Sequence, residues 1–155
     1  MPPFNTLGHI AFKVHDLAAS LAFYGKLGFP EMLRLINDKG EPWIVYLRVT
    51  DDLYLELFPL AVVGEHVPPE NNVGMTHLCL TSPDLDVTEA HLKSVGVPLS
   101  RPRSEKRGLD GNRGMWVEDP DGNRIEIMEM APDCIQHQAV KNLRAGKPPQ
   151  ALKLS

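Results

Sequence analysis

The chain has 155 residues, of which 43% are hydrophobic and 23% are charged, and its formal net charge at pH 7 is −4. These values are typical of a globular protein with a core, and the negative charge argues against broad electrostatic binding to nucleic acid. No stretch is apolar over the length of a membrane span, and the two cysteines form neither a disulfide framework nor a Cys-x-x-Cys pair. We therefore expect a cytoplasmic protein with neither nucleic acid nor membrane as a partner.

The first half of the chain predicts a strand, a helix and three more strands. Residues 7–14 alternate between aliphatic positions on one face and positions such as His9 on the other. Asp16 is the expected N-cap of a helix that closes at Gly25 and Gly28. Turn residues separate the further strands, which we expect over residues 31–36, 43–49 and 53–58.

The second half repeats this order of elements. Residues 75–81 predict a strand, and Asp86 with Glu89 fits a capping box at the start of a helix that ends at Gly96. Further strands are expected to begin at Val97 and to cover residues 114–118 and 124–129. Each half therefore reads β-α-β-β-β, which predicts an α+β fold. In this fold two βαβββ modules form a cupped, partly open mixed β-sheet with the helices outside.

We expect residues 1–155 to form a single domain. The expected parts are module 1 over about residues 7–60, a linker over about 61–73, module 2 over about 74–131 and a C-terminal tail over 132–155. The linker is predicted from its glycine, prolines and asparagines, and the tail has at best a short amphipathic helix.

The last expected strand begins after the turn Asp119-Pro120-Asp121-Gly122-Asn123. Within that turn, proline pre-sets φ, an aspartate can bond back to the backbone, and glycine accepts a positive φ. Glu126 then stands in mid-strand between Ile125 and Ile127. A carboxylate among apolar neighbours is costly unless it is paired, hydrogen-bonded or bound to a metal, although a strand face open to water would explain a single such residue.

The polar strand positions repeat between the two halves. His9 and His77 lie in the first expected strand of each half, and Glu56 and Glu126 lie in the last. Their separations nearly match, because 56 − 9 = 47 and 126 − 77 = 49. In each half these residues oppose the aliphatic face. Solvated positions do not readily account for this repetition, so we predict that the side chains converge on one metal ion.

Several short motifs follow one another along residues 7–131. They are Leu7-Gly8-His9, Phe23-Tyr24 with Leu27-Gly28-Phe29, Leu55-Glu56-Leu57, Thr76-His77-Leu78, and the turn Asp119–Asn123 followed by Glu126. In this order they resemble the motifs of the vicinal oxygen chelate superfamily, also called the glyoxalase/bleomycin resistance/dioxygenase family. The resemblance implies two βαβββ modules that chelate one divalent metal, with His9, Glu56, His77 and Glu126 at the ligand positions.

This ligand set is similar to that of lactoylglutathione lyase (glyoxalase I). The similarity implies a lyase or isomerase that acts on an α-oxo, hemithioacetal-like substrate through a metal-stabilised enediolate. Glu126 is the first candidate for the general base and Glu56 the second. Mixed nitrogen and oxygen ligands suit Ni, Co, Zn, Mn or Fe. Two alternatives on the same fold are an extradiol-type dioxygenase, against which the extra Glu56 argues, and a non-catalytic protein that binds a drug or metabolite.

The resemblance also bears on the substrate and on assembly. Lys13 and Leu60 stand where bacterial glyoxalase I enzymes typically carry an Arg and an Asn, and both departures argue against glutathione as the thiol. Residues 101–108 are locally basic and form either a solvated loop or a lid over an anionic substrate, with Arg113 as the best single cation. We expect a homodimer, with a metal site that lies either within one chain or between two.

Overall fold

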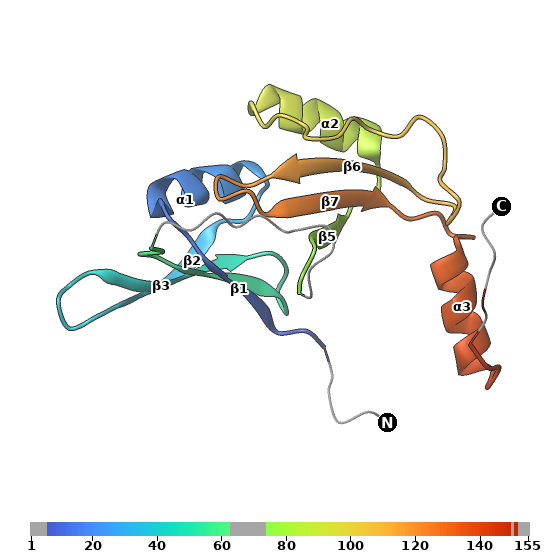
Figure 1. Cartoon of the computed structure of the whole chain (residues 1–155), viewed down its shortest axis with the longest axis horizontal. Coiled ribbons are helices and arrows are strands. Elements are labelled where there is room, and N and C mark those ends of the chain that lie inside the picture. The colour runs from blue at the N-terminus through green and yellow to red at the C-terminus, as the bar shows by residue number, and fades with distance from the viewer. Residues whose placement is uncertain (1–5, 63–73, 150, 152–155) are drawn as a thin grey trace. The chain divides into compact units, whose positions relative to one another are not determined.

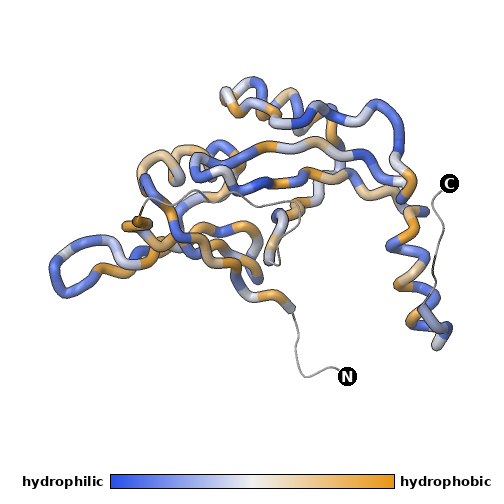
Figure 2. Tube along the Cα trace, viewed as in Figure 1, coloured by the Kyte–Doolittle hydropathy of each residue, from blue (hydrophilic) through white to orange (hydrophobic). Residues whose placement is uncertain are grey.

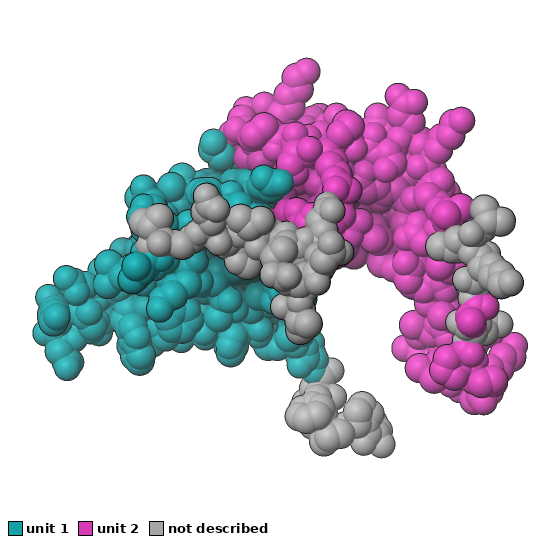
Figure 3. All heavy atoms as spheres, viewed as in Figure 1, with its two compact units in different colours: residues 1–76, 118–123 teal, residues 77–117, 124–155 magenta. Residues whose placement is uncertain are grey.

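The computed structural model describes residues 6–62, 74–149 and 151. The chain divides into two compact units, which Figure 3 colours separately: unit 1 comprises residues 1–76 and 118–123, and unit 2 comprises residues 77–117 and 124–155. Most of the predicted linker, residues 63–73, lies outside the described residues. Within the described ranges, no helix has both the length and the apolar composition that crossing a membrane requires.

Unit 1 contains a helix and a four-stranded mixed sheet (Figure 1). Its elements are β1 (His9–Lys13), α1 (Leu17–Lys26), β2 (Glu31–Ile36), β3 (Pro42–Arg48) and β4 (Tyr54–Phe58). The strand order is β1-β4-β3-β2, in which β1 runs parallel to β4 and the other neighbours are antiparallel. The predicted β-α-β-β-β order of module 1 is therefore confirmed.

Local sequence signals account for these elements. The Asp16 side chain accepts the Ala19 N–H at 3.0 Å and caps α1, and Gly28 ends it with a φ of +87°. In β4, Leu55 and Leu57 are buried while Glu56 between them lies on the opposite face, as the alternation predicted. Figure 2 shows that the turn between β2 and β3 is hydrophilic, as expected for an exposed hairpin end.

Unit 2 contains a three-stranded sheet and two helices. Its elements are β5 (Leu78–Thr81), α2 (Leu85–Ser94), β6 (Arg113–Glu118), β7 (Arg124–Glu129) and α3 (Ile135–Arg144). The strand order is β5-β7-β6, with β5 parallel to β7. Both units together give the predicted α+β class, with two βαβββ-like modules and mixed sheets.

Two local predictions in the second half are wrong. The expected strand beginning at Val97 is reduced to a single bridge between Arg101 and Trp116, because Pro98 and Pro102 have no N–H to donate to a ladder. The N-cap of α2 also lies two residues earlier than expected.

Asp84, and not Asp86, is the N-cap of α2. Its side chain accepts the N–H groups of Asp86 at 2.9 Å and Val87 at 3.1 Å, so α2 begins at Leu85. The predicted capping partner, Glu89, instead accepts a hydrogen bond from Arg103 at 2.7 Å.

The turn Asp119–Asn123 belongs to unit 1 and is built around one buried carboxylate. Asp119 accepts the N–H groups of Asp121 at 3.0 Å and Asn123 at 2.8 Å, and Gly122 has a φ of +82°. The buried Tyr24 hydroxyl of α1 also donates to Asp119, at 2.8 Å. This turn therefore has the tight geometry that its sequence predicts, and a side chain of α1 holds it.

Candidate functional site

The first histidine–glutamate pair lies within unit 1. Because β1 and β4 are parallel and adjacent, His9 and Glu56 project from neighbouring strands, and their Nε2 and Oε2 atoms lie 3.6 Å apart. The His9 ring stacks on Tyr54 with ring centroids 5.5 Å apart, which orients the imidazole. The Glu56 side chain is only 12% exposed, so this carboxylate is not a freely solvated strand residue.

A tyrosine of the next strand lies beside the first pair. Tyr46 on β3 is directly opposite Glu56 in the strand register. Partial burial, together with the negative charge of Glu56, raises the pKa of Tyr46, so its hydroxyl stays protonated beside the carboxylate. The unit 1 pair is therefore bordered by two phenol rings, those of Tyr46 and Tyr54.

The second histidine–glutamate pair lies within unit 2 and repeats the first. His77 immediately precedes β5, Glu126 lies on β7, and their Nε2 and Oε2 atoms are 3.4 Å apart. The His77 ring meets the edge of Trp116 with ring centroids 4.9 Å apart. The Glu126 side chain is 18% exposed. Both carboxylates therefore share the same partial burial and the same kind of partner.

The neighbour of Glu126 in the register is Cys79. Burial, followed by the negative charge of Glu126, raises the pKa of Cys79 to about 11. In the absence of a bound metal ion, the side chain is therefore a neutral thiol at pH 7.

Each pair fits two positions in the coordination of a divalent ion. Two donor atoms about 2.1 Å from one ion lie about 3.0 Å apart at an octahedral angle and about 3.4 Å apart at a tetrahedral one. The observed separations of 3.4 and 3.6 Å are close to these values. Among the described residues, no single group of three or more His, Cys, Asp or Glu side chains is arranged to hold a metal. That the two pairs share one ion therefore stays a prediction.

Unit 2 has a cavity of about 300 Å³ beside Glu126. Its polar and aromatic lining includes Arg101, Ser104, Asn112 and Trp116. Gly114 also lines the cavity, and a Cβ there would lie 3.4 Å from Oε1 of Glu126. A molecule in this cavity would thus be next to the Glu126 carboxylate.

The predicted substrate cation, Arg113, is already paired with acids. Its guanidinium donates to both carboxylate oxygens of Glu129, at 3.2 and 2.7 Å, and lies 3.7 Å from Asp86. These interactions raise the pKa of Arg113 and lower that of Glu129. A role for Arg113 in substrate binding stays a prediction, as does that of the exposed Lys13 on β1.

Arg101 is the cavity cation that sequence reasoning did not single out. Its guanidinium lies over the Trp116 ring, 5.5 Å from the centroid, and it has no acidic partner within the described part of the chain. The only sequence signal was its place in the basic segment 101–108. Which arginine of that region is neutralised depends on acids from α2 and β7, and residue spacing does not reveal this.

Comparison with known proteins identifies the group to which these features belong. The family model of the glyoxalase/bleomycin resistance protein/dioxygenase superfamily matches residues 6–127. The chain is also 30% identical over 122 residues to the uncharacterized protein YaeR of Escherichia coli (strain K12), a match that covers 78% of this chain and 93% of YaeR. The chain belongs to this superfamily.

Solved structures of the superfamily share the fold. A glyoxalase family protein from Enterococcus faecalis superposes with a TM-score of 0.69 at 23% identity, covering 81% of this chain and 98% of that one. A lactoylglutathione lyase from Agrobacterium tumefaciens superposes with a TM-score of 0.59 at 24% identity, covering 83% of this chain and 96% of that one. The predicted superfamily and its fold are therefore confirmed.

Proposed function

We propose that this member of the superfamily is a metal-dependent lyase or isomerase of the glyoxalase I type. In this proposal His9, Glu56, His77 and Glu126 bind one divalent ion, drawn from Ni, Co, Zn, Mn and Fe, and the substrate is an α-oxo compound such as a hemithioacetal. The observation that carries the proposal is the repetition of the imidazole–carboxylate pair, at 3.6 and 3.4 Å, at corresponding places in the two units. A single pair would be an ordinary surface interaction, whereas its repetition supplies a four-ligand set.

The chemistry divides between the ion and the protein groups. When bound, a divalent ion supplies Lewis acidity to a substrate with adjacent oxygen atoms. Glu126 borders the cavity beside Gly114, so we assign it the proton transfer. Its carboxylate would take the proton from the carbon that carries the hydroxyl group and return it to the neighbouring carbonyl carbon, while the hydroxyl proton moves to the former carbonyl oxygen. We assign no proton transfer to Glu56, which lies opposite Tyr46 and beside His9 and acts only as a metal ligand.

Arg101 gives the cavity a cation for an anionic group of the substrate, although the acids Asp110 and Glu126 also line it. Arg101 lines the cavity with Glu126, and it lacks an acidic partner among the residues that the structure describes. The Trp116 face under the guanidinium limits its motion. A carboxylate on the substrate, some distance from its α-oxo group, would complete this arrangement.

The experiment combines metal content with turnover. The gently purified protein is analysed for metals and assayed with hemithioacetals of methylglyoxal and several thiols. We expect about one divalent ion per four-ligand set and turnover that Glu126→Gln reduces by a factor on the order of 10²–10⁴. Glu118→Gln, at the exposed end of β6, is the matched control and should leave turnover unchanged.

Three results would contradict the proposal. Full activity of Glu126→Gln would remove the carboxylate from the chemistry. Oxygen consumption with catechols under Fe(II), without hemithioacetal turnover, would indicate a dioxygenase. Metal-free protein that binds a small molecule without converting it would indicate a sequestering protein.

A further inference from the structure

Helix α3 is attached at its start, and it presents aliphatic side chains that the described residues leave unburied (Figure 1). At its start, the Ile135 N–H donates to the Asp110 carbonyl at 3.1 Å, and the Gln136 side chain bonds Asp110 and Asn112. None of the side chains of α3 itself is buried, and Leu143 is 68% exposed. A rigidly attached helix with exposed aliphatic side chains has a surface suited to a partner.

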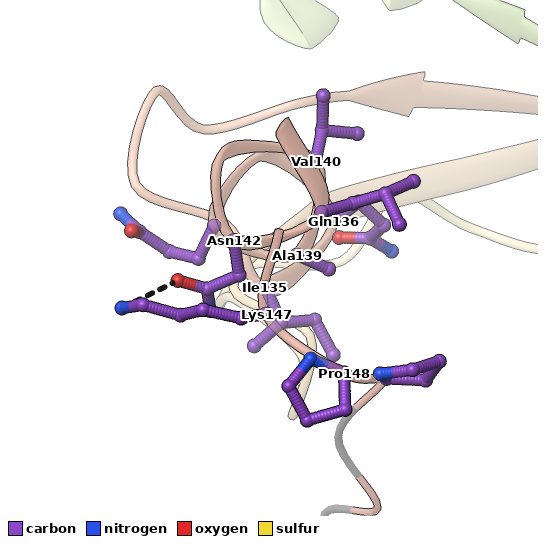
Figure 4. A pocket seen from close by; sticks show the side chains of 10 residues that line it. Ile135, Gln136, Ala139, Val140, Asn142, Lys147 and Pro148 are labelled. Atoms are coloured by element: carbon purple, nitrogen blue, oxygen red, sulfur yellow. Dashed lines mark hydrogen bonds between the residues drawn. The ribbon is translucent and has the colours of Figure 1, made fainter. Parts of the chain in front are cut away.

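The chain turns back after α3 and forms one wall of an apolar groove (Figure 4). Gly146 has a φ of +72°, and the Lys147 N–H donates to the Asn142 carbonyl at 3.0 Å, which reverses the chain. Pro148 and Pro149 then lie along the groove, which has a volume of about 560 Å³. The proline rings fix the backbone angle φ, so this wall of the groove loses little conformational entropy when a partner binds.

The aliphatic stripe of α3 is symmetric about its centre. Ile135, Ala139 and Leu143 line the groove at positions i, i+4 and i+8, so a large side chain stands on each side of a small one. A two-fold axis at Ala139 would place Ile135 against Leu143 of the partner subunit and bring the two Ala139 side chains together. Such self-complementarity is what an isologous contact between identical chains requires.

We propose that α3 packs antiparallel against α3 of a second copy of this chain, around a two-fold axis at Ala139. Charge supports this arrangement. Asp133 precedes the helix, where it lies 3.2 Å from Arg107 of the same chain and stays largely exposed, and Lys141 and Arg144 lie at the end of the helix. An antiparallel pair brings each acidic end to the basic end of the partner, while a parallel pair would bring like charges together.

The size of this contact sets its strength. Each copy contributes a 10-residue helix and two prolines, which is small beside a standard interface of about 1,600 Å². We therefore expect a reversible dimer with a dissociation constant on the order of 10 μM. A lipid surface fits less well, because α3 has no aromatic side chain to anchor it and the net charge of the chain is −4.

Sedimentation velocity of the full chain, from about 1 to about 300 μM, brackets the expected constant. Ala139→Glu places two carboxylates at the axis and should raise the dissociation constant at least tenfold. Val87→Glu, which likewise places a carboxylate at an exposed aliphatic position, here on α2, is the control and should have no effect. Both changes are at helix surfaces, and circular dichroism verifies that each variant folds.

Mixing two charge variants tests the antiparallel register. Arg144→Glu alone and Asp133→Lys alone each oppose like charges and should weaken self-association severalfold. In an equimolar mixture, both contacts are again between opposite charges, so the heterodimer should regain the affinity of the original chain. A structural effect of either substitution would not be repaired by mixing.

The proposal is overturned if the protein stays monomeric over the whole range, if Ala139→Glu dimerises normally, or if mixing restores nothing. Binding of the monomer to anionic phospholipid vesicles, lost in Ala139→Glu, would replace it with a membrane contact. None of these readouts depends on metal or turnover, so they are independent of the proposed function.

Discussion

The hydrogen bond from Tyr24 to Asp119 provides the sharpest test of how the Asp119–Asn123 turn is held. Both side chains are buried, and the bond is 2.8 Å long. Hydrogen bonds between a neutral donor and a charged acceptor contribute about 1.5–3 kcal/mol. Asp119 keeps three other donors, two backbone N–H groups and the Asn123 amide, so Tyr24→Phe should lower the free energy of unfolding by about 2 kcal/mol.

Urea unfolding measures this loss. For an m-value of about 2 kcal/mol per M, the midpoint of Tyr24→Phe should fall by about 1 M. Tyr54→Phe is the matched control, because no partner of the Tyr54 hydroxyl is found among the described residues, and it should change the midpoint little. An unchanged midpoint in Tyr24→Phe, or equal losses in the two variants, would refute the assignment of this bond as a principal restraint on the turn.

The pH dependence gives a second readout of the same bond. Burial, followed by the charge of Asp119, raises the pKa of Tyr24 well above its usual value of 10.0. The unfolded chain therefore releases the phenolic proton first, and stability falls as the pH rises above about 10. Because Phe has no such proton, the stability difference between the original chain and Tyr24→Phe should shrink in that range. A difference that grows with pH would contradict this account.

Two further predictions concern unit 2. Arg101→Ala should raise KM for an anionic substrate by about tenfold to a hundredfold and change kcat little, because the substitution removes substrate binding and not proton transfer. Steady-state kinetics measure this effect, with Arg107→Ala as the control. An equal loss in kcat would contradict it. Glu129→Gln should remove part of the acid sensitivity of folding. The hydrogen bond from Arg113 lowers the pKa of Glu129, so the ionised carboxylate stabilises the fold above the unfolded pKa of about 4.5. This stabilisation is lost as the pH falls through the lower pKa of the folded state. Urea midpoints from about pH 3 to 7 measure this, and identical pH profiles would refute it.

Elements whose signals are local could be predicted from the sequence. The cap at Asp16, the positive φ at Gly28 and the alternation around Glu56 all depend on residues within one turn or one strand. For the same reason β1 to β4 and β7 were placed to within a residue or two. The errors in unit 2 were also local: two prolines prevented a ladder near Val97, and Asp84 capped α2 in place of Asp86.

The candidate site also has features that the sequence predicts and features that only the fold decides. The repeat of histidine and glutamate at nearly equal spacing was readable without coordinates, because strands alternate their faces with a fixed period. The pairing of β1 with β4 and of β5 with β7 was not, because strand neighbours are chosen by contacts between distant residues. Only those pairings bring each imidazole to 3.4–3.6 Å from its carboxylate.

The amino-acid sequence by itself determined the superfamily, the order of elements in each half and the residue types of the candidate ligands. Tertiary structure alone decided which charges are balanced. Arg113 is neutralised by Glu129, whereas Arg101 lies on Trp116 without an acidic partner among the described residues. The physical reason is that propensity, caps and strand alternation act over a few residues, whereas charge pairing and burial depend on side chains brought together from distant parts of the chain.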